Sequence, residues 1–229
     1  MPPPSEPLRH LVVLGHPSPK SLNHAIAEAY CAAVRACGQT PMLRDLYAQG
    51  FDPLLKADER PGAEPVAPRP EVAGEVEFVR SADAVVLVYP IWFGMPPAII
   101  KGYIDRVLGA GFGSEALKAG HPNPLLEGKR LLILSTSATT RPWLEEQGQW
   151  VGLRQAFDHY LVHVFRMAGS EHVHFDAVVE GMSERVVREH LETVRSAASS
   201  LCSMLLRARH GRAAEAAVRR RAKDGAAAD

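Results

Sequence analysis

The chain has 229 residues, of which 46% are hydrophobic, and its mean hydropathy is close to zero. These values predict a globular protein with one main domain and a full apolar core. The 26 basic and 26 acidic residues give a formal net charge of zero, which removes the electrostatic argument for a nucleic-acid partner or an anionic membrane surface.

Residues 1–7 lack the basic and then apolar order of a signal peptide, and no apolar run is long enough to span a bilayer. Cys31, Cys37 and Cys202 are an odd number, fall in expected helices and form no CxxC motif, which favours reduced thiols without a metal or redox role. We therefore expect a cytoplasmic protein that does not insert into a membrane.

The first half of the chain alternates strands with helices. Residues 11–15 predict a short apolar strand, a helix follows it, and residues 41–46 predict a second strand. Residues 47–70 are rich in Pro, Asp and Gly and show little periodicity, so we expect a long excursion with at most one helical turn. A short helix over residues 71–80 comes next.

A continuous apolar run over residues 84–88 predicts a strand that is buried on both faces. An aromatic loop follows directly. The double proline Pro96-Pro97 then predicts the first turn of a helix that runs to about residue 108.

The second half repeats the pattern. Residues 131–136 predict a fourth buried strand, and residues 155–167 predict a helix that ends at Gly169. Residues 172–176 alternate apolar with polar side chains, which suits a fifth strand at the sheet edge with one wetter face. Ser183 opens a final helix with one apolar stripe for docking on the sheet.

Five strands alternating with helices predict an α/β fold. We expect a five-stranded parallel sheet of order 2-1-3-4-5 with right-handed crossovers and helices on both faces. This domain covers residues 1–208. Residues 209–229 are rich in Ala and Arg without a pattern for a packing partner, and we expect a disordered or frayed tail.

The first loop is suited to binding an anion. It follows a strand and opens a helix, whose N-terminus offers unpaired amides and positive potential. Ser18, Ser21 and Asn23 add neutral donors, and His16 or Lys20 can add charge. No GxGxxG or GxxxxGK[ST] motif is present, which disfavours a dinucleotide Rossmann site and a P-loop. In the alternative interpretation, Ser21 only caps the helix.

The loop after the third strand is suited to a flat ligand. Trp92 and Phe93 lie at the carboxyl end of a central parallel strand, where open α/β sheets bind their ligands. The alternative is that these rings fold back onto the domain. Together, an anion loop and an aromatic loop beside the topological switch point indicate a phosphorylated planar cofactor, for which flavin is the obvious candidate.

Several motifs carry a family resemblance: His16 with Ser21-Leu22-Asn23, Asp45-Leu46-Tyr47 with Phe51-Asp52-Pro53, Tyr89-Pro90-Ile91-Trp92-Phe93-Gly94, and Lys101-Gly102-Tyr103-Ile104-Asp105-Arg106-Val107. Over roughly its first 140 residues the chain resembles the flavodoxin-like NAD(P)H:quinone oxidoreductases. That family includes the flavoprotein subunits of bacterial potassium-efflux systems.

The resemblance implies a homodimer that binds FMN or FAD and passes a hydride from NADH or NADPH to a quinone or similar small electrophile. The flavin carries this chemistry, so no catalytic side chain is assigned. Three loops supply the implied cofactor-binding residues, which are His16, Ser18, Ser21, Leu22, Asn23, Pro90, Ile91, Trp92, Phe93, Gly94, Thr136, Ser137, Ala138 and Thr139.

Two departures from the family pattern stand out. The loop spacing before Pro97 leaves open whether Trp92 or Phe93 faces the flavin ring. The fourth loop has Thr136-Ser137-Ala138-Thr139 where the family usually has two threonines and two glycines, and the family's following Tyr and His are not matched. Because one flat pocket holds nicotinamide and acceptor by turns, we expect ping-pong kinetics. The alternative is a regulatory flavoprotein that binds a partner such as a potassium-efflux transporter.

The remaining histidines and aromatic residues receive structural interpretations. His159 and His163 are four residues apart on a helix, and His172 and His174 share one face of a strand, but no third metal ligand falls in register. We expect solvated or interface histidines and no metal. Aromatic surface at Trp143, Trp150 and Phe157 is expected to pack in the core or in a dimer interface.

Overall fold

A computed structural model describes residues 6–60, 68–113, 115, 118–121 and 123–226. The five expected strands form one parallel sheet in the order β2-β1-β3-β4-β5, as the alternation of strands and helices predicted. Their bounds are Arg9–Leu14 for β1, Thr40–Asp45 for β2, Ala84–Pro90 for β3, Arg130–Thr136 for β4 and Gly169–Phe175 for β5.

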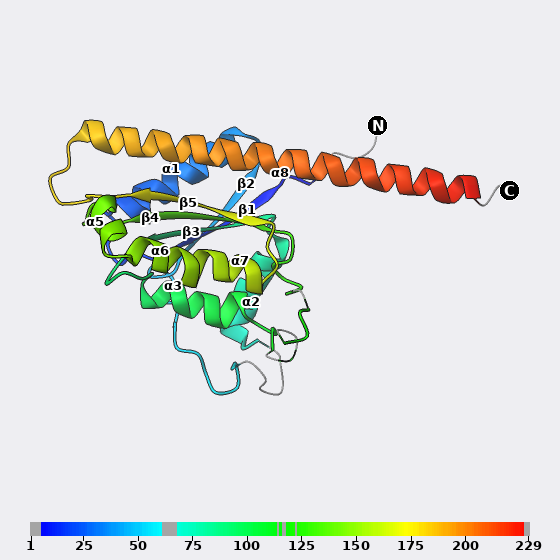
Figure 1. The fold of residues 1–229 in the computed structure, drawn as a ribbon, viewed down its shortest axis with the longest axis horizontal. Coiled ribbons are helices and arrows are strands. Elements are labelled where there is room, and N and C mark those ends of the chain that lie inside the picture. Colours follow the sequence, from blue (N-terminus) through cyan, green and yellow to red (C-terminus); the bar gives the residue numbers. More distant parts are fainter. Residues whose placement is uncertain (1–5, 61–67, 114, 116–117, 122, 227–229) are drawn as a thin grey trace.

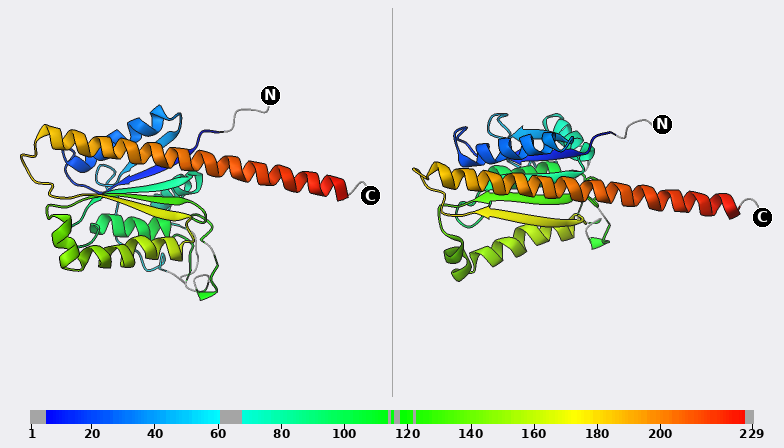
Figure 2. Two further views of the ribbon diagram at one scale, coloured as in Figure 1. Left: turned by 45° about the horizontal axis from the view of Figure 1, so that its top comes forward. Right: turned by 90° about the horizontal axis from the view of Figure 1, so that it is seen from above.

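Helices cover both faces of this sheet (Figures 1 and 2). One face carries α1 (Leu22–Ala36) and α8 (Glu184–Ala226). The other face carries α2, α3 and the π-helical turn η1, together with a second group that consists of α5, α6, η2 and α7. The bounds are Pro70–Ser81 for α2, Ala98–Tyr103 for α3, Ile104–Leu108 for η1, Arg141–Glu146 for α5, Gln149–Leu153 for α6, Arg154–His159 for η2 and Tyr160–Val164 for α7.

The central strand β3 buries all of its residues. Val85, Leu87 and Tyr89 belong to the apolar cluster under α2 and α3, whereas Val86 and Val88 belong to the cluster under α1 and α8. A strand with two buried faces needs apolar residues at consecutive positions, which is why this run could be recognised without alternation.

The prediction for the fourth helix was wrong at both ends. Helical structure already begins at Arg141, and it ends at Val164 rather than near Gly169. The chain leaves the helix at Arg166, which adopts a positive φ of 50° while the amide of Met167 donates to the carbonyl of Val162. Gly169 is instead the first residue of β5.

Helix α8 docks on α1 through the predicted apolar stripe. Val194, Ala198, Leu201 and Leu205 are buried, and the expected opening residue Ser183 accepts a hydrogen bond from the amide of Val186 at 3.4 Å. Beyond the sheet the helix continues to Ala226 (Figure 2). The structure therefore has a helix where the sequence analysis expected a disordered or frayed tail from residue 209. The division into a domain and a tail at residue 208 stays a prediction.

The long excursion after β2 has no helix or strand over its described residues 47–60 and 68–69, while residues 61–67 of the predicted excursion lie outside the described part. Its first half packs on α3 at Gly102, where a Cβ atom would overlap the backbone of Pro53. Close approach of two backbones is the physical reason for glycine at this position of the motif.

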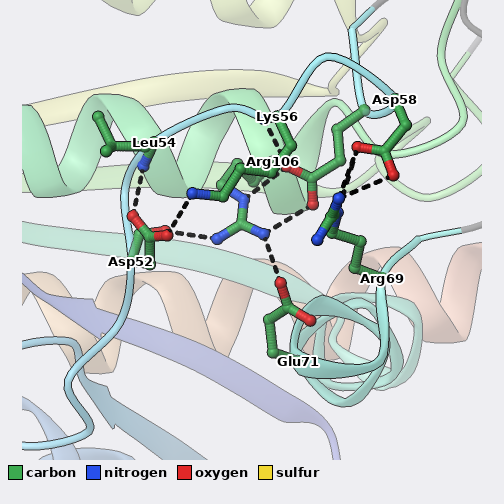
Figure 3. A network of polar contacts seen from close by, with 8 residues as sticks. Asp52, Leu54, Lys56, Asp58, Arg69, Glu71 and Arg106 are labelled. Atoms are coloured by element: carbon green, nitrogen blue, oxygen red, sulfur yellow. Dashed lines mark hydrogen bonds and ion pairs between the residues drawn. The ribbon is translucent and has the colours of Figure 1, made fainter.

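Arg106 holds the same excursion in place (Figure 3). Its guanidinium is fully buried and donates to Glu59 at 2.7 and 2.8 Å, to Glu71 at 3.0 Å and to the carbonyl of Asp52 at 2.6 Å. Hydrogen bonding to Arg106 lowers the pKa of Glu59. The Lys-Gly-x-x-Asp-Arg motif therefore has a structural explanation, because its Gly and Arg both fasten the excursion to the domain.

Two further observations concern the whole chain. Cys31, Cys37 and Cys202 are free thiols, and the first and last of them are buried. None of the helices in the described residues combines the length and the apolar character that crossing a bilayer requires.

Candidate functional site

A cleft of about 710 Å³ lies at the carboxyl edge of the sheet, where the loops after β1, β3, β4 and β5 meet. Strand order reverses between β1 and β3, so the cleft is at the topological switch point. The predicted residues that line it are His16, Ser18, Ser21, Leu22, Asn23, Pro90, Ile91, Trp92, Thr136, Ser137 and Ala138. Three predicted residues do not, namely Phe93, Gly94 and Thr139.

The first loop delivers polar groups at the N-terminus of α1. Ser21 is the N-cap, and its Oγ accepts from the amide of His24 at 3.4 Å while also lying 2.9 Å from Nδ1 of the same histidine. Nε2 of His24 lies 3.0 Å from Oδ2 of Asp45. Ser21 thus caps the helix and lines the cleft, and the two interpretations of this residue are compatible.

The side-chain amide of Asn23 gives the clearest indication of a ligand-binding site. The side chain is buried, and its Oδ1 accepts a hydrogen bond from Oγ1 of Thr136 at 3.0 Å, which ties the amide to the end of β4. Among the described residues, Nδ2 of Asn23 has no acceptor. Because an unpaired buried donor costs free energy, this amide is expected to donate to a ligand in the cleft.

His16 connects the polar and the aromatic ends of the cleft. Its ring lies 5.8 Å from the ring of Trp92, and the amide of Ser18 donates to Nδ1 at 3.0 Å. Burial lowers the pKa of His16, and acceptance at Nδ1 requires the neutral ring. In that form, Nε2 carries a proton that His16 can donate.

The aromatic loop is a tight turn that separates its two rings. Trp92 and Met95 exchange backbone hydrogen bonds at 3.0 and 3.1 Å, and the intervening Phe93 and Gly94 have positive φ values of 50° and 80°. This turn brings Trp92 to the cleft and leaves Phe93 fully exposed. Of the two residues left open by the sequence, Trp92 lines the cleft and Phe93 does not.

The fourth loop is tied to its neighbours by backbone hydrogen bonds. The amide of Ile91 donates to the carbonyl of Thr136 at 2.7 Å, and the amide of Ser137 donates to the carbonyl of Phe175 at 3.0 Å. The hydroxyl of Ser137 donates to the carbonyl of Thr139 at 2.7 Å. Thr139 thus accepts a hydrogen bond within the loop and does not line the cleft.

Sequence reasoning missed the wall that follows β5. It consists of Val178, Val179, Glu180, Met182 and Val187. This segment has no motif of its own, but it follows the carboxyl end of a parallel strand. The edge rule that selected the other loops could have included it.

The interpretation of the later histidines needs correction. The side chain of His172 is completely buried, and its Nδ1 lies 2.7 Å from Oδ2 of Asp158, whose carboxylate is buried too. The helix group from α5 to α7 covers this side of β5, so the expected wetter face is wrong. His159 and His163 are exposed. In the described part of the chain, no group of three or more His, Cys, Asp or Glu residues is arranged to hold a metal ion.

Of the three aromatic residues expected in the core or an interface, two belong to the core. Trp150 and Phe157 are buried, and only Trp143 is substantially exposed, with 44% of its surface accessible. The idea that all three form an exposed aromatic surface is therefore wrong.

Comparison with known proteins places this fold in a family. Residues 8–201 match the family described as having a flavodoxin-like fold. An uncharacterized NAD(P)H oxidoreductase of Haemophilus influenzae is 32% identical over 171 residues, which cover 74% of this chain and 82% of that protein. The rat NAD(P)H dehydrogenase [quinone] 1 is 32% identical over 149 residues, covering 57% of this chain and about half (54%) of the relative.

Solved structures agree on the fold. An NAD(P)H:quinone oxidoreductase from Methanothermobacter marburgensis superposes with a TM-score of 0.72 at 22% identity, covering 85% of this chain and 99% of the other. An FMN-dependent NADH-azoreductase from Bacillus anthracis, solved in complex with FMN, gives a TM-score of 0.59 at 15% identity, covering 85% and 99%. The chain belongs to the flavodoxin-like family that includes NAD(P)H oxidoreductases and quinone reductases.

Proposed function

We propose that the protein is a flavin-dependent oxidoreductase that transfers a hydride from NAD(P)H to a quinone or a similar small electrophilic acceptor. The observation that carries the proposal is the buried Nδ2 of Asn23, which has no acceptor among the described residues and lies in a cleft that also presents Trp92. The named activities of the relatives support it. The cleft volume of about 710 Å³ is within the usual range for cofactor sites.

The residues around the cleft divide between the two ends of a flavin. Ser18, Lys20, Ser21 and Asn23 would hold a phosphate at the positive end of α1. When bound, the flavin supplies the hydride chemistry. Trp92 would cover the ring on one side, and the loop at Thr136 and Ala138 would exclude water from its edge.

Binding of FMN and of FAD tests the cofactor assignment. Either flavin at about 100 times its dissociation constant should stabilise the fold by about 2.7 kcal/mol, measurable as a rise in Tm. Asn23→Ala should weaken binding, because it removes the unpaired donor. Asn123→Ala is a matched control, since Asn123 is also buried but bonds the carbonyl of Leu108 and the amide of Leu125 outside the cleft. It should lower Tm without changing flavin affinity. If neither flavin raises Tm, the assignment fails.

We also propose ping-pong kinetics, because a single exposed ring face beside Trp92 would serve nicotinamide and acceptor in turn. NAD(P)H should then reduce the bound flavin anaerobically without an acceptor. Trp92→Ala should slow that reduction, whereas Phe93→Ala should leave it unchanged, because Phe93 is fully exposed and does not line the cleft. Intersecting double-reciprocal lines would contradict the mechanism.

A cytoplasmic homodimer completes the proposal. Exposed Phe93, Trp143 and Tyr160 are large side chains that a second copy could cover. An apolar groove of about 300 Å³ between η1 and α7, lined in part by Ile104 and Leu161, lies on the same side of the sheet as Tyr160. Sedimentation at tens of micromolar, roughly the concentration at which a stable interface persists, should show a dimer. A monomer under those conditions would remove this part of the proposal.

A further inference from the structure

A continuous line of polar side chains, buried except for the half-buried His174, connects the interior of the helix group to the cleft. We call it the buried chain, and its members in order are Asp158, His172, Ser135, His174 and Ser137. The successive contacts are 2.7, 2.6, 2.8 and 3.1 Å long. At its outer end, Ser137 lines the cleft and lies 2.7 Å from the carbonyl of Thr139. The proposed hydride transfer does not use any of these contacts.

The members come from three elements that pack around one aromatic ring. Asp158 belongs to the π-helical turn η2, Ser135 to β4, and the two histidines to β5. The ring of Trp150 lies 4.9 Å from that of His172 and 5.1 Å from that of His174. Side chains of Asp158 and His172 are fully buried, as is Ser135. Water therefore does not reach the inner end directly.

Hydrogen-bond counting distinguishes two directions of the buried chain, of which only one makes every contact. A carboxylate only accepts, so Nδ1 of His172 donates to Asp158. If both histidines are neutral, Ser135 donates to Nε2 of His172, His174 donates from Nδ1 to Ser135, and Ser137 donates inward to Nε2 of His174. The hydroxyl of Ser137 then cannot also donate to Thr139, because it has one proton.

With one additional proton, every contact is satisfied at once. Nε2 of His172 donates to Ser135, Ser135 donates to Nδ1 of His174, and Nε2 of His174 donates to Ser137. The hydroxyl of Ser137 is then free to donate to the carbonyl of Thr139 at the observed 2.7 Å. The additional proton belongs to the pair formed by Asp158 and His172.

We propose that the buried chain conducts one proton between the cleft and the pair of Asp158 and His172. Inward conduction starts when a hydronium ion in the cleft gives a proton to Oγ of Ser137 and becomes water. The Ser137 proton passes to Nε2 of His174, the Nδ1 proton of His174 passes to Ser135, and the Ser135 proton passes to Nε2 of His172. No bond between heavy atoms changes, and one positive charge is added beside the carboxylate. Outward conduction reverses each step.

The carboxylate of Asp158 favours the proton on this pair rather than on His174, although the guanidinium of Arg154 opposes part of that effect. Nε of Arg154 lies 3.5 Å from Oδ2 of Asp158, and Oδ1 has no hydrogen-bond partner among the described residues. That carboxylate therefore depends on His172 and Arg154 for compensation. Burial, followed by repulsion from His172, lowers the pKa of His174 to about 4, so His174 stays neutral while it relays.

Other titratable or charged groups around the buried chain come from three more segments. Arg141 of α5 lies over Trp150, 4.8 Å from the ring centre, and its charge opposes a proton on His174. Asp176, after β5, has the reverse effect. Tyr89 of β3 is buried near Asp158, and burial raises the pKa of its phenol well above its usual value. Tyr89 thus remains protonated.

In the part that rests on the proposed function, the buried chain would balance charge that arrives in the cleft. A hydride brings negative charge to the site, and a proton drawn onto the pair of Asp158 and His172 offsets it. The residues of the buried chain are positioning and proton-holding groups, since only Ser137 lines the cleft.

Nitrogen-15 NMR of the histidine rings tests the buried chain without any cofactor. During a pH titration, the ring of His174 should exchange its Nδ1 proton for an Nε2 proton. It should do so at the same midpoint at which His172 gains its Nε2 proton. Ser135→Ala should abolish this common midpoint. His163→Gln, which removes an exposed imidazole, should preserve it. A single His174 tautomer at every pH, or two separate midpoints, would overturn the proposal.

A second measurement tests the link to the cleft. NADH is used to reduce bound FMN in weakly buffered solution with a pH indicator. The unaltered protein should take up as much as about one proton per flavin more than Ser135→Ala, by proton linkage, and His163→Gln should match the unaltered protein. Equal uptake by all three would overturn the charge-balancing role while the NMR result still decides conduction. Failure of FMN to bind would instead overturn the proposed function, and with it this link.

Discussion

Replacement of Arg106 by methionine should be among the most damaging single changes in the domain. Its guanidinium makes two hydrogen bonds to Glu59, one to Glu71 and one to the carbonyl of Asp52 (Figure 3). Methionine keeps an unbranched apolar stem but removes every donor. The Glu59 side chain, only 6% exposed, would then be a buried carboxylate that has lost its charged partner and keeps only the hydrogen bond from the amide of Lys56 at 2.9 Å among the described residues.

The expected cost is about 3 to 5 kcal/mol, the usual penalty for removing one member of a buried ion pair. Glu71 adds little, because its side chain is 53% exposed and exposed pairs contribute less than about 1 kcal/mol. Most of the loss should therefore come from stranding Glu59. Neutralising that residue should recover much of it, so Arg106→Met with Glu59→Gln should be more stable than Arg106→Met alone.

Urea unfolding followed by circular dichroism, with free energies from linear extrapolation, completes a double-mutant cycle. A loss below about 1 kcal/mol for Arg106→Met would refute the reasoning. A loss that small is typical of an exposed ion pair and would mean that no buried charge had been stranded. Equal stability of the single variant Arg106→Met and the double variant would also refute it, because the stranded carboxylate would then not be the cause.

Three further predictions concern separate features. Gly102→Ala should destabilise the fold because its Cβ overlaps the backbone of Pro53, whereas Gly74→Ala, in the open interior of α2, should stabilise it by roughly 0.5 to 1 kcal/mol; opposite signs in urea unfolding are the test. Burial lowers the pKa of His10 below its ordinary 6.5, so at acidic pH the unfolded chain binds more protons than the folded chain. Stability should therefore fall as pH drops below that value. The slope of Tm against pH should be smaller in His10→Gln. Thr136→Val keeps a side chain of similar shape in the cleft but removes the hydroxyl that donates to Asn23, so it should free the amide of Asn23 to rotate and weaken flavin binding in calorimetry; an unchanged dissociation constant would contradict that coupling.

Local patterns predicted the parts of this molecule that local physics determines. The run over residues 84–88 could be recognised as a central strand because burial on two faces demands consecutive apolar side chains. Ser21 could be placed at a helix start because the capping hydrogen bond joins residues three apart. The loops at the carboxyl edge of the sheet followed from strand order alone.

The errors arose where distant residues decide. No sequence pattern near His172 predicts that Asp158 is its partner, because their contact forms only when η2 packs over β5. Gly169 looked like a helix terminator, but the chain had already turned at Arg166, a residue that rarely takes a positive φ. Phe93 and Trp92 are neighbours of similar chemistry, and only the turn at Phe93 and Gly94 separates the exposed ring from the one in the cleft.

Helix α8 is one continuous helix, but different interactions stabilise its two parts. Its 43 residues span about 65 Å, and Leu205 is the last of its residues that is buried among those whose burial is described, which end at residue 215. Before that point, amide protons are protected by the docking on α1; after it, they depend on the helix's own hydrogen bonds, which are marginal in water. Hydrogen exchange should therefore divide one helix into a slow segment and a fast one, and a protease should be able to cut the helix beyond Leu205 while the sheet stays folded.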